Sequence, residues 1–132
     1  MSKNNGDCIF CNKSNCKIIK ENKYFFVIRD TAYPVTKHHT LIISNRHVDD
    51  YFKLTIEELN ELSKLLKEQK AELNSLDETI SGFNIGVNVG KDAGQSIMHC
   101  HIHLIPRRKG DVDDPKGGVR GVIPSKQKYS RK

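Results

Sequence analysis

The chain has 132 residues, of which 36% are hydrophobic and 29% are charged, and its net charge is +6. This length and composition favour one soluble globular domain over 1–132 and disfavour a disordered chain. No apolar run approaches the ~18 residues of a membrane span, and the N-terminus MSKNNGDCIF lacks the apolar segment of a secretory signal. We therefore expect a cytoplasmic protein with no membrane partner.

The N-terminal stretch, residues 1–23, is polar and carries three of the four cysteines. Cys8 and Cys11 form a Cys-x-x-Cys pair, whereas Cys16 and Cys100 have no such spacing. The pair can be a redox couple, half of a zinc site or a chance pairing of thiols. A redox couple usually lies in a strand–helix–strand context, which is missing here, and a tetrahedral zinc site needs two further ligands.

Two strands and a helix are predicted next along the chain. Residues 24–30 and 40–43 are rich in aromatic and β-branched side chains, which favours strands. Thr55 can then cap a helix, and Glu58 completes a capping box three residues later. Leucines follow at helical spacing, so we predict one main helix at roughly 55–75.

The second half of the chain predicts two further strands. Residues 81–90 alternate strictly between apolar and polar or small side chains, which is typical of a half-buried strand. After a glycine-containing turn, residues 97–106 form another strand, which we expect Pro106 to end. Residues 108–132 are a basic, glycine-containing tail that we predict to be irregular and partly ordered. This order of elements indicates an α+β fold with a mainly antiparallel sheet.

Three of the six histidines, His99, His101 and His103, occupy alternate positions of the last predicted strand. They share one face of it, while Cys100 and its alternating apolar neighbours share the other face, where the helix should pack. Anchors on one face step by about 7 Å, so one metal ion cannot easily bind all three. Surface histidines or a zinc site within the row are alternatives, but the row better suits separate tasks along an extended substrate.

Polar side chains precede this row. Gly94 permits close backbone approach, while Gln95 and Ser96 offer hydrogen-bond donors. Most such triplets are merely turns, but donors beside histidines suit phosphate oxygens. Asn88 lies on the polar face of the preceding strand, and if the two strands pair as a hairpin it faces the histidines.

These residues together resemble the histidine triad (HIT) family. Its signature is His-x-His-x-His followed by two apolar residues and preceded by Gly-Gln-Ser or Gly-Gln-Thr, and PVTKHHTLIISNRHV and GFNIGVNVG resemble further family segments. The likeness covers residues 8 to about 107. It implies the HIT-like fold: an antiparallel sheet of about five strands, one main helix, and a short N-terminal helical or zinc-bound segment. It also implies a homodimer.

The resemblance implies cleavage of a purine nucleotide at its α-phosphorus. His101 would be the nucleophile and form a nucleotidyl-histidine intermediate, from which water releases a nucleoside monophosphate. His103, Gln95 and Ser96 would hold phosphate oxygens as charge develops. Substrates would be dinucleoside polyphosphates or nucleoside phosphoramidates.

Other family positions match three residues upstream. His39 matches a histidine that assists the triad, and its neighbour His38 stands where the family usually has glycine or a small residue. Asn88 matches an amide that contacts phosphate or ribose. Asp30 resembles the residue that binds ribose hydroxyls.

Some bacterial members of the family carry structural zinc on a Cys-x-x-Cys pair, an upstream histidine and the first triad histidine. These ligands match Cys8, Cys11, His47 and His99. The resemblance therefore implies a closed zinc site with no open position for water. The alternative is a thiol pair without metal.

Three other functions are alternatives to the hydrolase. The family's transferase branch has glutamine where His103 stands, which favours water as the final acceptor here. Its DNA-end-repair branch adds a zinc module, whereas this sequence holds no cysteine or histidine after His103, so a nucleic-acid partner is not expected. A nucleotide-binding or scaffold protein with little catalysis remains open.

Arg120 would meet a phosphate if the tail folds over the nucleotide; the tail can equally be a flexible basic terminus.

Overall fold

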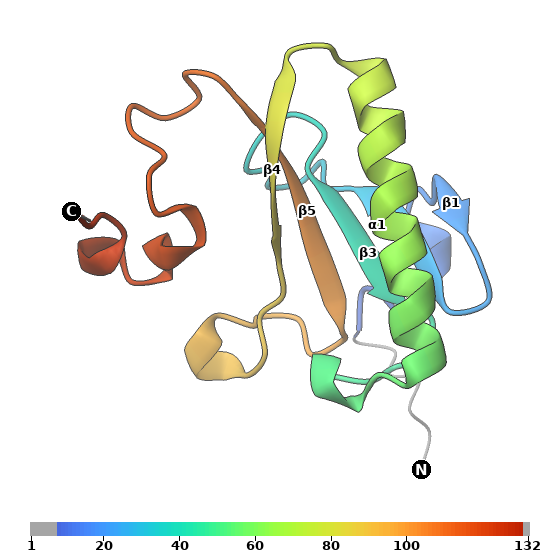
Figure 1. The fold of residues 1–132 in the computed structure, drawn as a ribbon. Coiled ribbons are helices and arrows are strands. Elements are labelled where there is room, and N and C mark those ends of the chain that lie inside the picture. Colours follow the sequence, from blue (N-terminus) through green and yellow to red (C-terminus); the bar gives the residue numbers. More distant parts are fainter. Residues whose placement is uncertain (1–7, 131–132) are drawn as a thin grey trace.

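Five strands form one antiparallel sheet in the computed structural model, which describes residues 8–130. The strands are β1 (Lys20–Glu21), β2 (Phe25–Arg29), β3 (Thr40–Ser44), β4 (Ile80–Gly86) and β5 (His101–Arg108), in spatial order β1-β2-β3-β5-β4. Helix α1 (Ile56–Leu76) runs along the sheet (Figure 1). The predicted α+β class, with about five antiparallel strands and one main helix, is confirmed. The described residues exclude 1–7 and 131–132. The first range belongs to the N-terminus in which no secretory signal is predicted, and the second to the tail.

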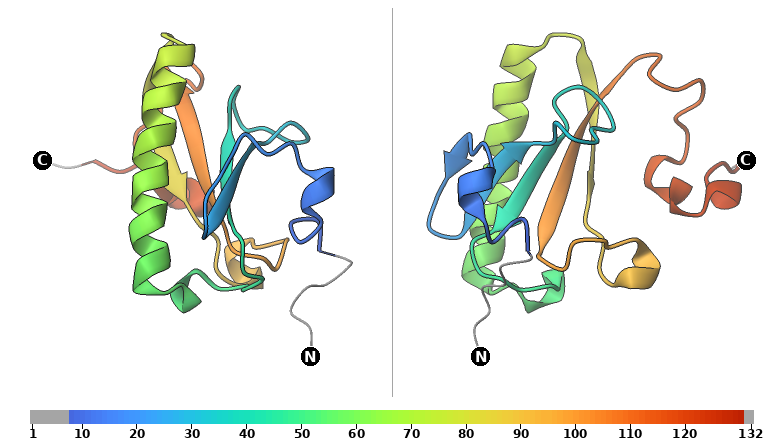
Figure 2. Two further views of the ribbon diagram at one scale, coloured as in Figure 1. Left: turned by 90° about the vertical axis from the view of Figure 1, so that its right-hand side faces the viewer. Right: turned by 180° about the vertical axis from the view of Figure 1, so that it is seen from behind.

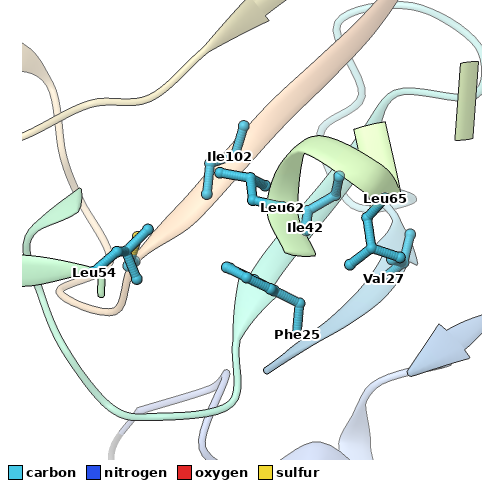
Figure 3. Close-up of a cluster of buried hydrophobic side chains, with 8 residues drawn as sticks. Phe25, Val27, Ile42, Leu54, Leu62, Leu65 and Ile102 are labelled. Atoms are coloured by element: carbon cyan, nitrogen blue, oxygen red, sulfur yellow. The ribbon is translucent and has the colours of Figure 1, made fainter. Parts of the chain in front are cut away.

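The sheet is covered on both faces. Figure 2 shows α1 on one face and the N-terminal segment, with its short 3-10 helix Lys13–Asn15, on the other. Leu62 and Leu65 of α1 pack on alternate residues of three strands (Figure 3). The strand residues of this cluster are Phe25, Val27, Ile42 and Ile102. Because strand side chains alternate between faces, the histidines of β5 point to the face opposite α1.

The start of α1 follows the predicted capping box. The Thr55 hydroxyl accepts a hydrogen bond from the Glu58 backbone N–H at 3.1 Å, and the Glu58 carboxylate accepts one from the Thr55 N–H at 2.8 Å. Two of the N–H groups that a helix start leaves unpaired are thereby satisfied. No helix of the described residues is long and apolar enough to cross a bilayer.

The last two strands are shorter than predicted at the ends that their connection joins. β4 ends at Gly86 and β5 begins at His101, so residues 87–100 form the connection, which includes the 3-10 helix Lys91–Ala93. The Cys100 N–H donates to the Val48 carbonyl at 2.6 Å, and the Ser44 N–H donates to the Cys100 carbonyl at 3.1 Å. The backbone just before β5 therefore pairs with the last residue of β3 and with the loop that follows it, and His99 lies outside the strand.

Pro106 does not end β5, contrary to prediction. The strand continues to Arg108, and Pro106 lies opposite Phe83 of β4. The Pro106 carbonyl accepts a hydrogen bond from the Thr36 hydroxyl at 2.6 Å, on the side where β3 would continue. The N and C=O of one strand residue point to the same side, and pairing with β3 ends at Leu104. The missing N–H of Pro106 therefore costs no ladder hydrogen bond.

The tail is more ordered than predicted. It leaves β5 and forms two 3-10 helices, Gly118–Val122 and Pro124–Lys126, beside β4 (Figure 1). The Arg120 guanidinium donates to the carbonyls of Lys126 and Gln127 at 2.9 and 3.2 Å. Arg120 therefore fastens the tail to itself in this structure, and its predicted contact with a phosphate stays a prediction.

Candidate functional site

Two cysteines and two histidines converge where β5 begins. The Cys8 and Cys11 sulfurs and the Nδ1 atoms of His47 and His99 all lie within 4.8 Å of one another. The His99 Nδ1 is 3.4 Å from the Cys8 Sγ and 3.1 Å from the His47 Nδ1, and the Cys11 Sγ is 3.0 Å from the His47 Nδ1. A tetrahedral zinc ion has ligand–ligand edges of roughly 3.3–3.8 Å, so these four groups lie close enough to bind a metal ion.

The surroundings of His99 also fit a metal ligand. Its Nε2–H donates to the Ser44 carbonyl at 2.7 Å, which leaves the lone pair on Nδ1, the atom that faces the cluster. Burial lowers the pKa of His99, which favours the neutral imidazole that metal binding needs. Cys100 lies on the opposite face in the core beneath α1, and burial raises its pKa to about 12. It is therefore a core thiol and not a fifth ligand.

The second histidine of the row has one ring nitrogen engaged. The Nδ1–H of His101 donates to the backbone carbonyl of His99 at 2.7 Å, so the lone pair is on Nε2. Burial lowers the pKa of His101, which keeps the imidazole neutral near pH 7. A neutral imidazole with one fixed N–H and one free lone pair is a competent nucleophile.

The third histidine is oriented by His39. The Val35 N–H donates to the His39 Nδ1 at 3.0 Å, so the proton of that ring is on Nε2. The His39 Nε2 lies 2.9 Å from the His103 Nδ1 and donates to it. His103 therefore carries its own proton on Nε2. Burial, together with neighbouring His101 and His39, lowers the pKa of His103 to about 4, so at neutral pH it is an uncharged hydrogen-bond donor.

His38 and His39, adjacent in sequence, have different places. His39 is 2% exposed and meets the triad, as the resemblance implies, whereas the His38 ring lies near Asp77, with 3.9 Å between Nε2 and Oδ2. His38 also has a φ of 73°, in the left-handed region that favours glycine. This backbone position gives a physical reason for a small residue there.

Asp30 and Asn88 both lie near these histidines. The Asp30 Oδ2 is 3.9 Å from the His39 Nδ1, and its Oδ1 accepts a hydrogen bond from the Tyr33 N–H at 3.0 Å. Asn88 lines an open cleft of about 640 Å³ together with His39, His103 and the tail. The structure therefore brings both predicted residues to the histidine face.

The two donors of the predicted Gly-Gln-Ser turn differ in accessibility. The buried Gln95 side chain accepts from the Gly90 N–H at 2.9 Å and donates to the carbonyls of Asp49 and Ile97 at 2.7 and 3.1 Å. These bonds hold the connection between β4 and β5 in place. Ser96 is exposed. Phosphate binding by both residues stays a prediction, with Ser96 the accessible one.

Phe10 is a site neighbour that the sequence reasoning missed. Its ring centroid lies 5.1 Å from that of His101 and 5.9 Å from that of His99. The signal that could have found it is its place between Cys8 and Cys11. A metal bound by both cysteines would hold the two residues between them, Ile9 and Phe10, at the same end of the sheet.

Known proteins match this chain in both sequence and structure. A family model described as HIT domain matches residues 12–110. An uncharacterized 16.1 kDa HIT-like protein from Mycoplasma pneumoniae is 37% identical over 107 residues, which cover 78% of this chain and 73% of the relative.

Two solved structures share the architecture. A Zn-bound histidine triad family protein from Mycobacterium smegmatis has a TM-score of 0.71 and 30% identity, covering 80% of this chain and 78% of that one. The diadenosine triphosphate hydrolase of Plasmodium falciparum, solved with Cyclomarin A, has a TM-score of 0.67 and 29% identity. That match covers 74% of this chain and 65% of the hydrolase.

Proposed function

Because this chain belongs to the HIT domain family, we propose that it is a nucleotide hydrolase that cleaves at the α-phosphorus through a nucleotidyl-His101 intermediate. The observation that carries the proposal is the difference in protonation between two neighbouring histidines. His101 has a free Nε2 lone pair, and His103 has a free Nε2–H. The likeness to a diadenosine triphosphate hydrolase supports it. The substrate would be a purine dinucleoside polyphosphate or nucleoside phosphoramidate.

The reaction would proceed in two displacements. The His101 Nε2 attacks the α-phosphorus, a nitrogen–phosphorus bond forms, and the bond to the leaving group breaks as that group departs with its electron pair and takes a proton from solvent. Positive charge then develops on the imidazole, where the Nδ1–H faces the His99 carbonyl. Water next attacks phosphorus, loses its proton to solvent and releases the nucleoside monophosphate, which restores neutral His101.

The remaining residues would bind and orient the substrate. The His103 Nε2–H and the Ser96 hydroxyl would donate to nonbridging phosphate oxygens, where negative charge grows in the transition state. Asn88 would contact phosphate or ribose from the cleft wall, and Asp30 would accept hydrogen bonds from ribose hydroxyls. Gln95 would contribute by holding the connection that carries Ser96, with a direct phosphate contact requiring its amide to exchange partners.

The metal site would hold zinc through Cys8, Cys11, His47 and His99. When bound, zinc would supply a crosslink between the N-terminal stretch, the loop after β3 and the start of the histidine row. Four protein ligands leave no open position, so the site would have a structural role. The Zn-bound family member from Mycobacterium smegmatis supports this assignment.

We also propose a homodimer built on β4 and α1. The outer side of β4 has no strand partner among residues 8–130. Ile85 on this strand is 53% exposed, and with Phe83 and Leu66 it lines an apolar hollow between β4 and α1. An open strand edge beside apolar side chains is a surface that a second copy of the chain can cover.

The experiment compares wild type with His101→Ala on diadenosine triphosphate and adenosine phosphoramidate. Wild type should release adenosine monophosphate and form an acid-labile adduct visible by mass spectrometry. His101→Ala should bind nucleotide in calorimetry but release none. His38→Ala is the matched control, since His38 lies outside the triad, and it should stay active. Nucleotide binding without release by wild type would favour a binding protein over the hydrolase.

A further inference from the structure

Phe10 connects the candidate metal site to the candidate nucleophile. It stands between Cys8 and Cys11 in the chain, and its ring is 4% exposed. The ring planes of Phe10 and His101 meet at 67°, with centroids 5.1 Å apart, and those of Phe10 and His99 meet at 87°. Both are edge-type contacts, a favourable geometry for aromatic rings.

The His101 imidazole lies between two rings and one carbonyl. Phe10 contacts it at 5.1 Å and His103 at 5.2 Å between centroids, while the His99 carbonyl binds its Nδ1–H. The hydrogen bond fixes the position of Nδ1, and the two rings limit rotation of the imidazole plane about it. The direction of the Nε2 lone pair therefore depends on the steric contact between the Phe10 ring and the imidazole.

The segment that carries Phe10 is held to the sheet largely through side chains. Backbone hydrogen bonds from Cys11 to Cys8 and from Cys16 to Lys13 fold the segment on itself, and it joins the sheet at Ile19, whose N–H donates to the Val27 carbonyl. Phe10 packs with Phe26, Leu41 and Ile43 on the histidine face. The cysteine ligands on either side of Phe10 reach His47 and His99, so a bound metal would hold this segment at both flanks of the ring.

We propose that Phe10 is a positioning residue through which the Cys8–Cys11 metal site holds the His101 imidazole in its attacking orientation. This inference rests on the proposed hydrolase function. It gives the metal an effect on the reaction although the metal touches no substrate. Misplacing a nucleophile by ~1 Å can cost about 100-fold in rate, so loss of the Phe10 contact should lower kcat measurably.

The test compares Phe10→Leu with Phe26→Leu in the zinc-loaded protein. Both remove a ring from the same apolar cluster, but Phe10 is the one that contacts His101. We expect Phe10→Leu to lower kcat about 10- to 100-fold while KM stays within about threefold, and Phe26→Leu to leave both nearly unchanged. An unchanged kcat in Phe10→Leu, or a raised KM alone, would overturn the proposal, since the latter would make Phe10 a substrate contact.

A second readout is independent of activity. The ring-carbon protons of His101, observed by NMR, should carry a ring-current shift from Phe10 that disappears in Phe10→Leu and persists in Phe26→Leu. Removing zinc with a chelator should move the wild-type His101 resonances toward their Phe10→Leu positions, and restoring zinc should reverse this. If the His101 resonances did not change on zinc removal, the coupling of the metal site to His101 through Phe10 would be refuted. Absence of mononucleotide release by wild type would instead refute the hydrolase, with the NMR result still standing.

Discussion

At the scale of single residues, three identical side chains differ in which ring nitrogen is engaged by a hydrogen-bond partner. The Ser44 carbonyl takes the Nε2–H of His99, the His99 carbonyl takes the Nδ1–H of His101, and His39 donates to the Nδ1 of His103. The free nitrogen is accordingly a lone pair that faces the cysteines in His99, an Nε2 lone pair in His101 and an N–H donor in His103. A histidine's tautomer, rather than its presence, decides its chemistry.

The low pKa of His103 predicts acid sensitivity. In the folded chain the pKa is about 4, against about 6.5 for a free imidazole, so between these values the unfolded chain binds more protons. The free energy of unfolding should thus fall as pH drops from about 6.5 towards about 4 and be unaffected by this group above that window. His103→Gln cannot titrate, so its denaturant-measured stability should fall less over this range.

The same comparison separates His103 from its neighbours. His39 and His101 face the same ring, and the Asp30 carboxylate opposes the shift by favouring the charged imidazole. His39 and His101, whose pKa values burial also lowers, are present in both proteins, so they contribute to both curves. Equal acid sensitivity of wild type and His103→Gln would assign the loss to those other groups.

At the scale of elements, the two loops at the ends of β3 carry much of the site. The loop before it ends in His38 and His39, and the loop after it carries His47. Arg46 anchors that second loop to α1, since its guanidinium binds both carboxylate oxygens of Glu58 at 2.8 and 3.0 Å. The helix start and the loop that carries His47 therefore share one buried carboxylate.

Replacing His38 with glycine should stabilise the fold. The φ of 73° costs a residue with a β-carbon about 1 kcal/mol or more, and glycine adopts it without that strain, although it adds entropy to the unfolded chain. We expect His38→Gly to raise the free energy of unfolding by up to about 1 kcal/mol in urea titrations. His38→Ala keeps the strain, so a gain of the same size in that variant would contradict the explanation.

Glu58 should affect both stability and metal retention. Glu58→Ala removes the carboxylate half of the capping box and leaves the Arg46 guanidinium with the Lys53 carbonyl at 3.2 Å but without its ion pair. Because the Arg46 side chain is half exposed, we expect a loss of about 2 kcal/mol rather than the larger cost of a fully buried pair. Glu58→Gln keeps a capping side chain and should lose less. His47 follows Arg46, so chelator should extract zinc faster from Glu58→Ala. Equal extraction rates in wild type and Glu58→Ala would show that the helix cap does not affect metal retention.

At the scale of the whole molecule, the sheet has two unlike edges. The β1 edge is a two-residue strand with both residues exposed. By contrast, β4 is seven residues long, lines an apolar hollow with α1 and has the tail beside it in the ribbon of Figure 1. A long, open, apolar edge favours pairing with another chain, while a short polar one does not. The proposed dimer uses the β4 edge for this reason.

A charge at the β4 edge should separate the protomers. Ile85→Lys would place an ammonium group in the proposed interface, where its burial is costly, so light scattering after gel filtration should show a monomer. Ile19→Lys, near the opposite edge of the sheet, is the matched control and should leave the dimer intact. A wild-type monomer, or a dimer that survives Ile85→Lys, would count against this interface.

The sequence by itself determined features that depend on near neighbours in the chain. The capping box of Thr55 and Glu58 predicted where α1 begins, and strand alternation placed Cys100 in the core and the histidines on the opposite face. The family resemblance also selected the candidate metal ligands, which the structure brings within 4.8 Å of one another. Helical and strand periodicities act over a few residues, so they are legible without the fold.

Only the tertiary structure decided the late start of β5, the tolerance of Pro106, the backbone contacts of Gln95 and the place of Phe10 beside His101. It also decided which nitrogen of His99 and of His103 is free. These features depend on contacts such as His39 with His103, which are 64 residues apart in the chain and meet only when β3 and β5 pair. Such hydrogen bonds form after the chain has folded, and no local pattern of residue types encodes them.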